Sequence, residues 1–255
     1  MKKSYKRHII ITLGILAIVA AGLFSGLQHQ KRPCSAMRIH YLNAERDTLL
    51  MPEEITSLIT AHTPVINTPI KELNTTAIRK FLCASPYILD AEMSFSLSGI
   101  LTIYITQQEI IARIIDRAND HRYLTLTGYY IPTGDVTVRV PVFNGHIAPI
   151  PTKDTTLSVE ELKDSTYREI YTLARTIRER PFMNALTEQV FRSPSGKYSI
   201  TPKIGVQRIL IGKGTQLEAH FDHLQLFYEQ ELPFIPPSRY KELDISYKNQ
   251  IVAKK

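Results

Sequence analysis

Two short patterns in the sequence could carry chemistry, and neither is complete. Gly212-Lys213-Gly214-Thr215 resembles part of a phosphate-binding loop, but Gln207 stands where the upstream glycine belongs, and a glycine follows the lysine instead of Ser or Thr. His220 and His223 would share one helix face, as paired metal ligands do, yet no third ligand cluster accompanies them. We therefore expect a strand-to-helix turn and helix-surface histidines here, with no cofactor and no metal.

The arrangements typical of covalent catalysis are not found either. The sequence contains no Gly-x-Ser-x-Gly nucleophile elbow, and the only two cysteines, Cys34 and Cys83, lie in no recognisable catalytic context. We expect a buried thiol at Cys83 and a free one at Cys34, because a linker cysteine and a helix cysteine have no evident reason to meet. The sequence gives no catalytic residues, and we expect a protein that is not an enzyme.

An apolar run near the N-terminus predicts a membrane anchor. Residues 9–27 are interrupted only by Thr12 and Ser25, and they reach the roughly 20 residues that a membrane span needs. Four basic residues precede the run and two follow it, which predicts a cytoplasmic N-terminus. The alternative is a cleaved signal peptide, but no small-residue cleavage site follows Leu27. We expect a single-pass type II inner-membrane protein with a tail at 1–8, a span at 9–27 and a linker at 28–36.

The net charge of +7 is concentrated in the tail. The first eight residues hold four of the 31 basic residues and no acidic one, so 27 basic residues face 24 acidic ones in the remainder. These are dispersed among one another and form no basic stripe, which argues against a nucleic-acid partner.

The periodicity of the sequence predicts a first domain at 37–107. A strand at 37–42, helices starting at Pro52 and near Asn74, and an alternating hairpin around Ser98-Gly99 give the order strand, helix, helix, strand, strand.

A second, β-rich domain is predicted at 108–255, so the fold class is α+β. A capping box at Ser158 and Glu161 predicts the start of its longest helix, and Leu217 begins another. Its strands are expected at 109–117, 123–131, 135–142, 189–192, 197–204 and 206–211.

The last alternating segment predicts a strand at 240–252. Leu243, Ile245 and Tyr247 alternate with polar residues. With no later segment to cover it, we expect this strand to lie at an open sheet edge, which can accept a strand from a partner. The alternative is an inert edge guarded by the lysines at 248, 254 and 255.

The order of these modules and four segments resembles the FtsQ/DivIB family of bacterial cell-division proteins. Residues 107–114 resemble the family's passage out of its POTRA domain, and 123–132 resemble its short strand with a central glycine. Residues 140–145 resemble its Leu-Pro-x-hydrophobic-x-Gly pattern, and 243–253 its closing strand. The chain departs from the family at 109–111, where Pro or Arg-Pro is usual, and in having no tryptophan.

The resemblance implies a non-enzymatic divisome scaffold at the septum, with a POTRA domain at 37–107. Such a scaffold links early division proteins to FtsB and FtsL and helps to control septal peptidoglycan synthesis. Its closing strand would pair with a strand of FtsB. The implied FtsB-binding residues are Ile245, Tyr247, Lys248, Asn249 and Ile251, with a secondary docking surface at Met37, Ile39 and Tyr41.

Two other functions stay open at this point. A POTRA-bearing component of envelope assembly or transport would bind unfolded or β-strand clients. A membrane-tethered envelope hydrolase would need catalytic residues brought together from distant positions. Whether the ectodomain self-associates is also open.

Overall fold

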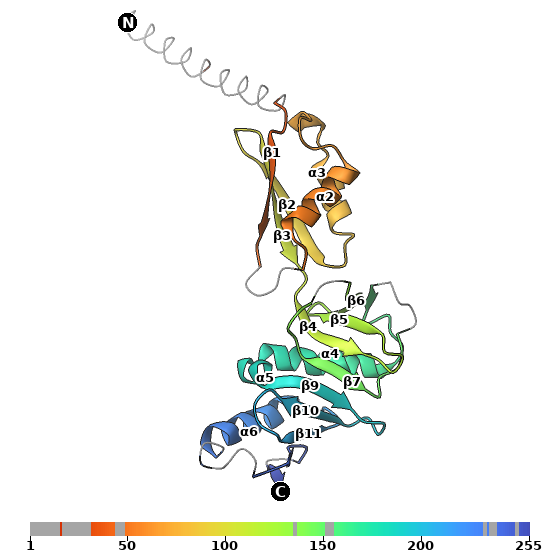
Figure 1. Cartoon of the computed structure of the whole chain (residues 1–255), viewed down its shortest axis with the longest axis vertical. Helices are drawn as coiled ribbons and strands as arrows, with labels where there is room; N and C mark the ends of the chain where they lie inside the picture. Colours follow the sequence, from red (N-terminus) through yellow and green to blue (C-terminus); the bar gives the residue numbers. More distant parts are fainter. Residues whose placement is uncertain are drawn as a thin grey trace, which may run out of the picture. The chain divides into compact units, whose positions relative to one another are not determined.

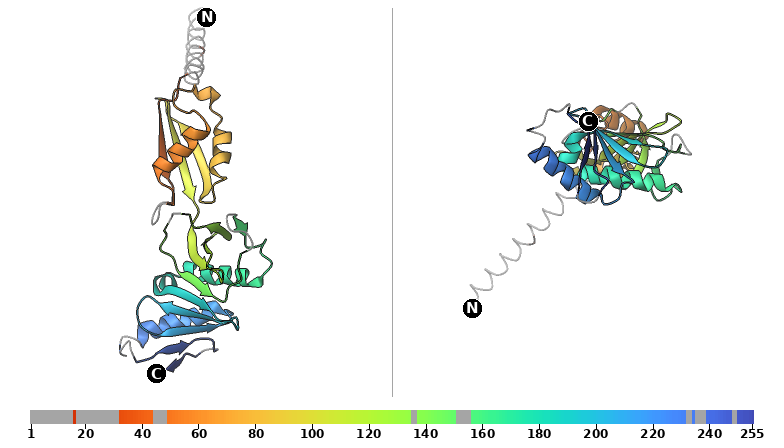
Figure 2. Two further views of the ribbon diagram at one scale, coloured as in Figure 1. Left: turned by 45° about the vertical axis from the view of Figure 1, so that its right-hand side comes forward. Right: turned by 90° about the horizontal axis from the view of Figure 1, so that it is seen from below.

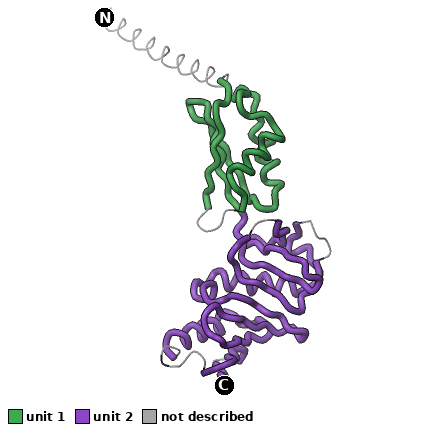
Figure 3. Tube along the Cα trace, in the orientation of Figure 1, with its two compact units in different colours: residues 1–107 green, residues 108–255 purple. Residues whose placement is uncertain are grey.

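The computed structural model describes residues 16, 32–43, 49–134, 137–150, 156–231, 234, 239–247 and 250–255. They divide into an N-terminal unit that ends at Gln107 and a C-terminal unit that begins at Gln108, each with its own hydrophobic core (Figure 3). The expected span at 9–27 lies outside the described residues except for Leu16. Within the described residues, no helix has the length and apolar character that crossing a membrane requires.

The N-terminal unit packs two helices against a three-stranded sheet. Its elements are β1 (Ala36–Tyr41), α2 (Pro52–His62), the 3-10 helix η1 (Ile70–Glu72), α3 (Thr75–Leu82), β2 (Ile88–Phe95) and β3 (Ile100–Gln107). The sheet order is β1-β3-β2, with β1 parallel and β2 antiparallel to β3. Asn74 caps α3 by accepting a hydrogen bond from the Ala77 backbone N–H at 2.9 Å.

Part of the expected linker belongs to this unit. Cys34 is fully buried, and its backbone bonds with Thr68 and Asn67 at 2.9 and 2.8 Å. Cys83 is only half-buried, so the sequence-based assignment of which thiol is buried is wrong. The reason is that Cys34 itself belongs to the core cluster of this unit, although the adjacent residues 32, 33 and 35 are exposed. Both thiols are free.

The C-terminal unit is built on one large mixed sheet (Figure 1). Its first strands are β4 (Ile110–Ile115), β5 (His121–Thr125), β6 (Tyr129–Pro132), β7 (Val142–Gly145) and β8 (Leu157–Ser158). Its later elements are α4 (Ser165–Glu179), α5 (Pro181–Leu186), β9 (Thr187–Arg192), β10 (Tyr198–Pro202), β11 (Arg208–Gly212), α6 (Leu217–Gln230), β12 (Glu242–Asp244) and β13 (Val252–Lys254). The spatial order is β13-β12-β11-β10-β9-β7-β4-β5-β6-β8.

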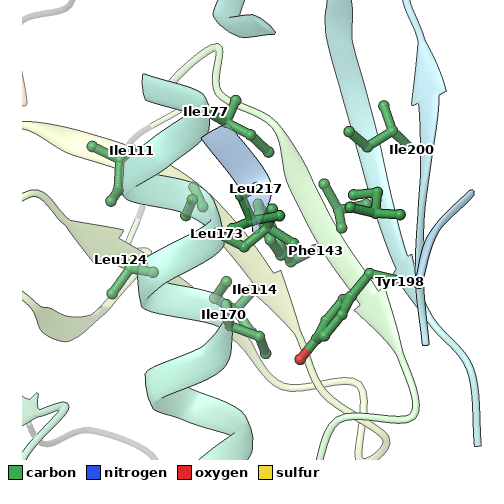
Figure 4. Close-up of a cluster of buried hydrophobic side chains, with 14 of the residues drawn as sticks. Ile111, Ile114, Leu124, Phe143, Ile170, Leu173, Ile177, Tyr198, Ile200 and Leu217 are labelled. Carbon is green, nitrogen blue, oxygen red and sulfur yellow. The ribbon is translucent and has the colours of Figure 1, made fainter. Parts of the chain in front are cut away.

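In the described part of this unit, helices α4, α5 and α6 lie on one face of the sheet (Figure 2). Ile170, Leu173 and Ile177 recur along the inner stripe of α4 and are all but fully buried. Figure 4 shows them facing sheet residues such as Ile114 and Phe143. Helices packed on a mixed sheet make this an α+β fold, which is the fold class expected from the sequence.

Turns divide two segments that the sequence analysis expected to be single strands. The stretch 123–131 spans parts of the hairpin β5–β6, because Gly128 adopts a positive φ of 83°. The stretch 240–252 contains β12 and only the first residue of β13. Strand β12 ends where the Asp244 carboxylate accepts bonds from the Ser246 N–H and hydroxyl at 3.0 and 2.6 Å, a local turn that replaces strand pairing.

Two other expected element positions are also wrong. In the expected strand at 135–142, residues 137–141 belong to no strand, although the Pro141 carbonyl accepts a bond from the Arg113 N–H at 2.9 Å, and β7 begins only at Val142. The capping box exists, since the Ser158 N–H donates to Glu161 at 2.7 Å, but it closes a turn. The longest helix of this unit begins later, where Asp164 caps α4.

Candidate partner-binding site

The end of the large sheet is anchored from the inside by two buried side chains. Leu243 on β12 is fully buried, and Ile245 just after it is 1% exposed. The Ile245 N–H donates to the Leu210 carbonyl at 2.9 Å, and the backbone N–H of Arg208 on β11 donates to the Lys241 carbonyl at 2.8 Å. Strand β12 is therefore fixed to β11 along its whole length, and this rigidity is what a docking edge requires.

Beyond β12 lies β13, the outermost strand at this end of the sheet. The two strands are antiparallel, and Glu242, Leu243 and Asp244 oppose Lys254, Ala253 and Val252. Figure 2 shows the dark blue strands at the end of the sheet, beside the C-terminus. Among the described residues no further strand pairs with β13, so its outer backbone groups face no neighbouring strand.

A glycine allows the segment after β12 to approach β11 closely. Gly212 has a φ of 74°, and a Cβ at this position would lie 2.9 Å from the Ser246 Cβ. This approach leads the chain out of the core between Ile245 and Tyr247. Tyr247 is 50% exposed, so its ring is available for contact.

The predicted FtsB-binding residues thus have different environments. The Ile245 side chain belongs to the core and cannot touch a partner without unfolding, whereas Tyr247 is exposed. Ile251 is half-buried and packs against the core. Lys248 and Asn249 lie outside the described residues. A further exposed residue at this edge is Val252, at 36%, which the sequence pattern does not indicate because the predicted strand ends there.

The site is basic. Its described residues from 239 to 255 include Arg239, Lys241, Lys254 and Lys255 against Glu242 and Asp244. Lys254 Nζ lies 2.5 Å from the Glu242 carboxylate, which raises the pKa of Lys254. The edge therefore suits a partner with acidic residues.

The secondary docking residues on β1 face the core of the N-terminal unit. Met37, Ile39 and Tyr41 are half-buried and pack against that core. The Tyr41 hydroxyl donates to the Leu50 carbonyl, and burial, with the charges of Glu53 and Glu54, raises the pKa of Tyr41 to about 12.

The exposed side chains of β1 are those between them. Arg38 and His40 are exposed, and His40 stacks on Tyr104 of β3 with ring centroids 5.9 Å apart. The alternation along β1 indicates two faces, and the predicted docking surface consists of the apolar face, which packs on the core, and not of the exposed face with Arg38 and His40. On the opposite side of the unit, a depression between α3 and β2 is lined by Thr75, Thr76, Arg79, Ala91, Glu92 and Met93.

Neither the glycine-rich segment at 212–215 nor the pair His220 and His223 forms a catalytic or metal-binding arrangement in the described structure. Gly212 and Gly214 both take positive φ, and α6 starts only at Leu217, so 212–216 forms a turn between strand and helix. His220 is buried, contrary to the expected helix-surface position, and His223 is half-buried. The described residues hold no group of three side chains suited to binding a metal.

The described fold and this edge define a mixed α+β domain in which the firmly anchored strand β12, with β13 outside it, lies at one end of the sheet. The family model "FtsQ/DivIB, C-terminal related" matches residues 109–254, more than half of the chain. The chain therefore belongs to the FtsQ/DivIB-related family, which confirms the resemblance. Members of the FtsQ/DivIB family are membrane-anchored, non-enzymatic scaffolds of cell division. Membership of the family therefore indicates a role in cell division. No curated protein matches it.

Proposed function

We propose that this protein is a divisome scaffold whose C-terminal unit binds FtsB, in complex with FtsL, at the β12–β13 end of its sheet. The observation that best supports this proposal is the contrast at that end between the buried side chains of Leu243 and Ile245 and the exposed side chain of Tyr247. An anchored strand followed by an exposed aromatic side chain combines main-chain pairing, which supplies affinity, with a side-chain contact, which supplies selectivity.

The remainder of the chain suits a tethered scaffold in this proposal. Residues 9–27 would anchor it in the inner membrane with 1–8 in the cytoplasm, and both units would lie in the periplasm. The N-terminal unit would act as a POTRA domain, because its order β1-α2-α3-β2-β3 is that of a POTRA domain. By holding FtsB and FtsL at the septum, the scaffold would help to control septal peptidoglycan synthesis.

Binding of the ectodomain to its partners tests this proposal. Residues 32–255 and the periplasmic parts of FtsB and FtsL from the same bacterium are mixed, and the Kd is measured for wild type and Tyr247→Ala. We expect wild type to bind and Tyr247→Ala to weaken binding by about tenfold or more, the range of an aromatic anchor.

Tyr129→Ala is the matched control. Tyr129 is 40% exposed on β6, at the other end of the same sheet, and we expect its removal to leave the Kd unchanged. A folded wild-type ectodomain that does not bind FtsB and FtsL would sink the proposal. The POTRA-bearing envelope-assembly function would then come forward, with the depression between α3 and β2 as the place to test for clients.

A further inference from the structure

Strand β12 pairs over the same three residues with β11 on its inner side and with β13 on its outer side, but its two neighbours differ in burial. On the inner side, bonds to β11 extend from Lys241 to Ile245, and Leu243 and Ile245 are buried beneath them. On the outer side β13 also contributes three paired residues, and the Lys241 N–H donates to the Lys254 carbonyl at 2.9 Å. Backbone pairing therefore does not distinguish the two sides; β11 is further held by its own buried side chains, Ile209 and Ile211.

Strand β13 buries little of its own surface. Val252 is 36% exposed, Lys254 is exposed, and Ala253 is the one β13 side chain that packs against the core. The ion pair between Lys254 and Glu242 joins side chains that are 60% and 27% exposed, so solvent screens it. Neither burial nor charge holds this strand tightly.

The outer edge of β13 is a poor platform for a further strand. It is three residues long and ends in Lys254 followed by Lys255, and charged side chains on an edge strand oppose pairing. The edge of β12 offers a longer extended backbone for pairing than the three residues of β13, because β11 holds the backbone of β12 from Lys241 to Ile245.

We propose that β13 occupies the partner's place on β12, and that a partner strand binds by displacing it. This inference rests on the proposed function and specifies how that same site is used. The partner segment is extended, with acidic side chains that complement Arg239 and Lys241 and a basic one opposite Glu242, in the place that Lys254 leaves with β13. It places an apolar side chain where Ala253 contacts the core. The hairpin thus covers a reactive edge until the partner arrives.

A reversible disulfide between the two strands tests displacement. Glu242 and Lys254 are register partners whose side chains already meet, so Glu242→Cys/Lys254→Cys locks β13 onto β12 when oxidised. The half-buried Cys83 is replaced by Ser in all proteins compared, and mass spectrometry verifies the bond. The Kd for the FtsB fragment is then measured with and without dithiothreitol. We expect at least tenfold weaker binding by the oxidised form than by the same protein after reduction.

Two further variants control for the lost ion pair and for folding. Glu242→Cys alone should bind equally in both redox conditions. A chain ending at Ile251 lacks β13 but keeps both buried anchors, so we expect it to fold and to bind at least as tightly as wild type. Equal binding by the locked and reduced forms, or loss of binding by the folded shortened chain, would overturn displacement. Failure of wild type to bind would instead overturn the proposed function itself.

Discussion

Ile245 and Tyr247, two residues apart after β12, have opposite environments. The Ile245 side chain is buried in the core, while half of the Tyr247 surface is exposed. Substituting the first removes an anchor of the fold, and substituting the second removes a contact surface. Only Tyr247 can therefore separate loss of binding from loss of folding, which is why the proposed binding experiment uses it.

His220 is the side chain for which we expect a direct coupling between pH and stability. It is 5% exposed, and neither ring nitrogen has a hydrogen-bond partner in the described part of the chain. Burial, with a smaller effect of the His223 charge, lowers its pKa below the ordinary 6.5. The unfolded chain then binds the proton more readily than the folded one, so stability falls as pH drops below about 6.5.

Substitution of His220 tests this coupling. Between pH 7.5 and 5, the unfolding free energy of wild type should decrease, and His220→Gln should flatten that slope by up to about 1.4 kcal/mol per pH unit, the value for one proton. Urea unfolding at several pH values measures it. The exposed His40→Gln is measured in parallel as a control for the substitution itself. An equal slope for wild type and His220→Gln would contradict the assignment.

At the scale of elements, the start of α4 gives a stability prediction. The Asp164 carboxylate accepts a hydrogen bond from the Thr166 N–H at 2.9 Å, and this bond lowers the pKa of Asp164. Asp164→Ala should therefore lower the unfolding free energy by about 1 kcal/mol, the usual value for a lost N-cap. Asp164→Asn, which keeps an acceptor, should cost less.

Ser158 is the matched control for this prediction. The sequence pattern around it is a capping box, but its bonds close a surface turn before α4. Ser158→Ala should change the unfolding free energy by less than about 0.5 kcal/mol. If urea unfolding showed a larger cost at Ser158 than at Asp164, the helix would start where the sequence pattern indicated.

Local sequence patterns predicted the helices and strands whose buried residues repeat at a regular spacing. They did not predict the ends of those elements, which depend on individual side-chain hydrogen bonds. The stripe of Ile170, Leu173 and Ile177 identified α4, and the alternation around Leu243 identified β12. The exact start of α4 depends on which of two acceptors faces a free helix N–H, and a sequence pattern does not distinguish them. Likewise, the end of β12 depends on the local bonds between Asp244 and Ser246.

The position of the sheet end was predictable from the sequence, but its form was not. Apolar alternation near residue 245 indicated a strand with an edge, and the described structure has a sheet end there. The fold-back of β13 onto β12 was not visible, because pairing between two short strands depends on the turn that joins them and not on periodicity. Likewise, an alternating pattern marks two faces without stating which one packs on a core, as Met37 and Ile39 illustrate.

At the scale of the whole molecule, charge and burial assign different tasks to different parts. The basic excess of the chain lies largely in the first eight residues, where it would fix topology, while the C-terminal edge keeps a smaller local excess. Each unit has its own core, so a docking site on the C-terminal unit needs no contribution from the N-terminal core.

The central claim is that the β12–β13 end of the sheet receives FtsB. Hydrogen–deuterium exchange of the ectodomain, with and without the FtsB fragment, tests this claim most directly because it reports backbone pairing along the whole chain. The account predicts slower exchange between Lys241 and Ile245, and no change on β6 and β8 at the opposite end of the sheet. Protection that appears only in the N-terminal unit, with exchange at β12 unchanged, would contradict it.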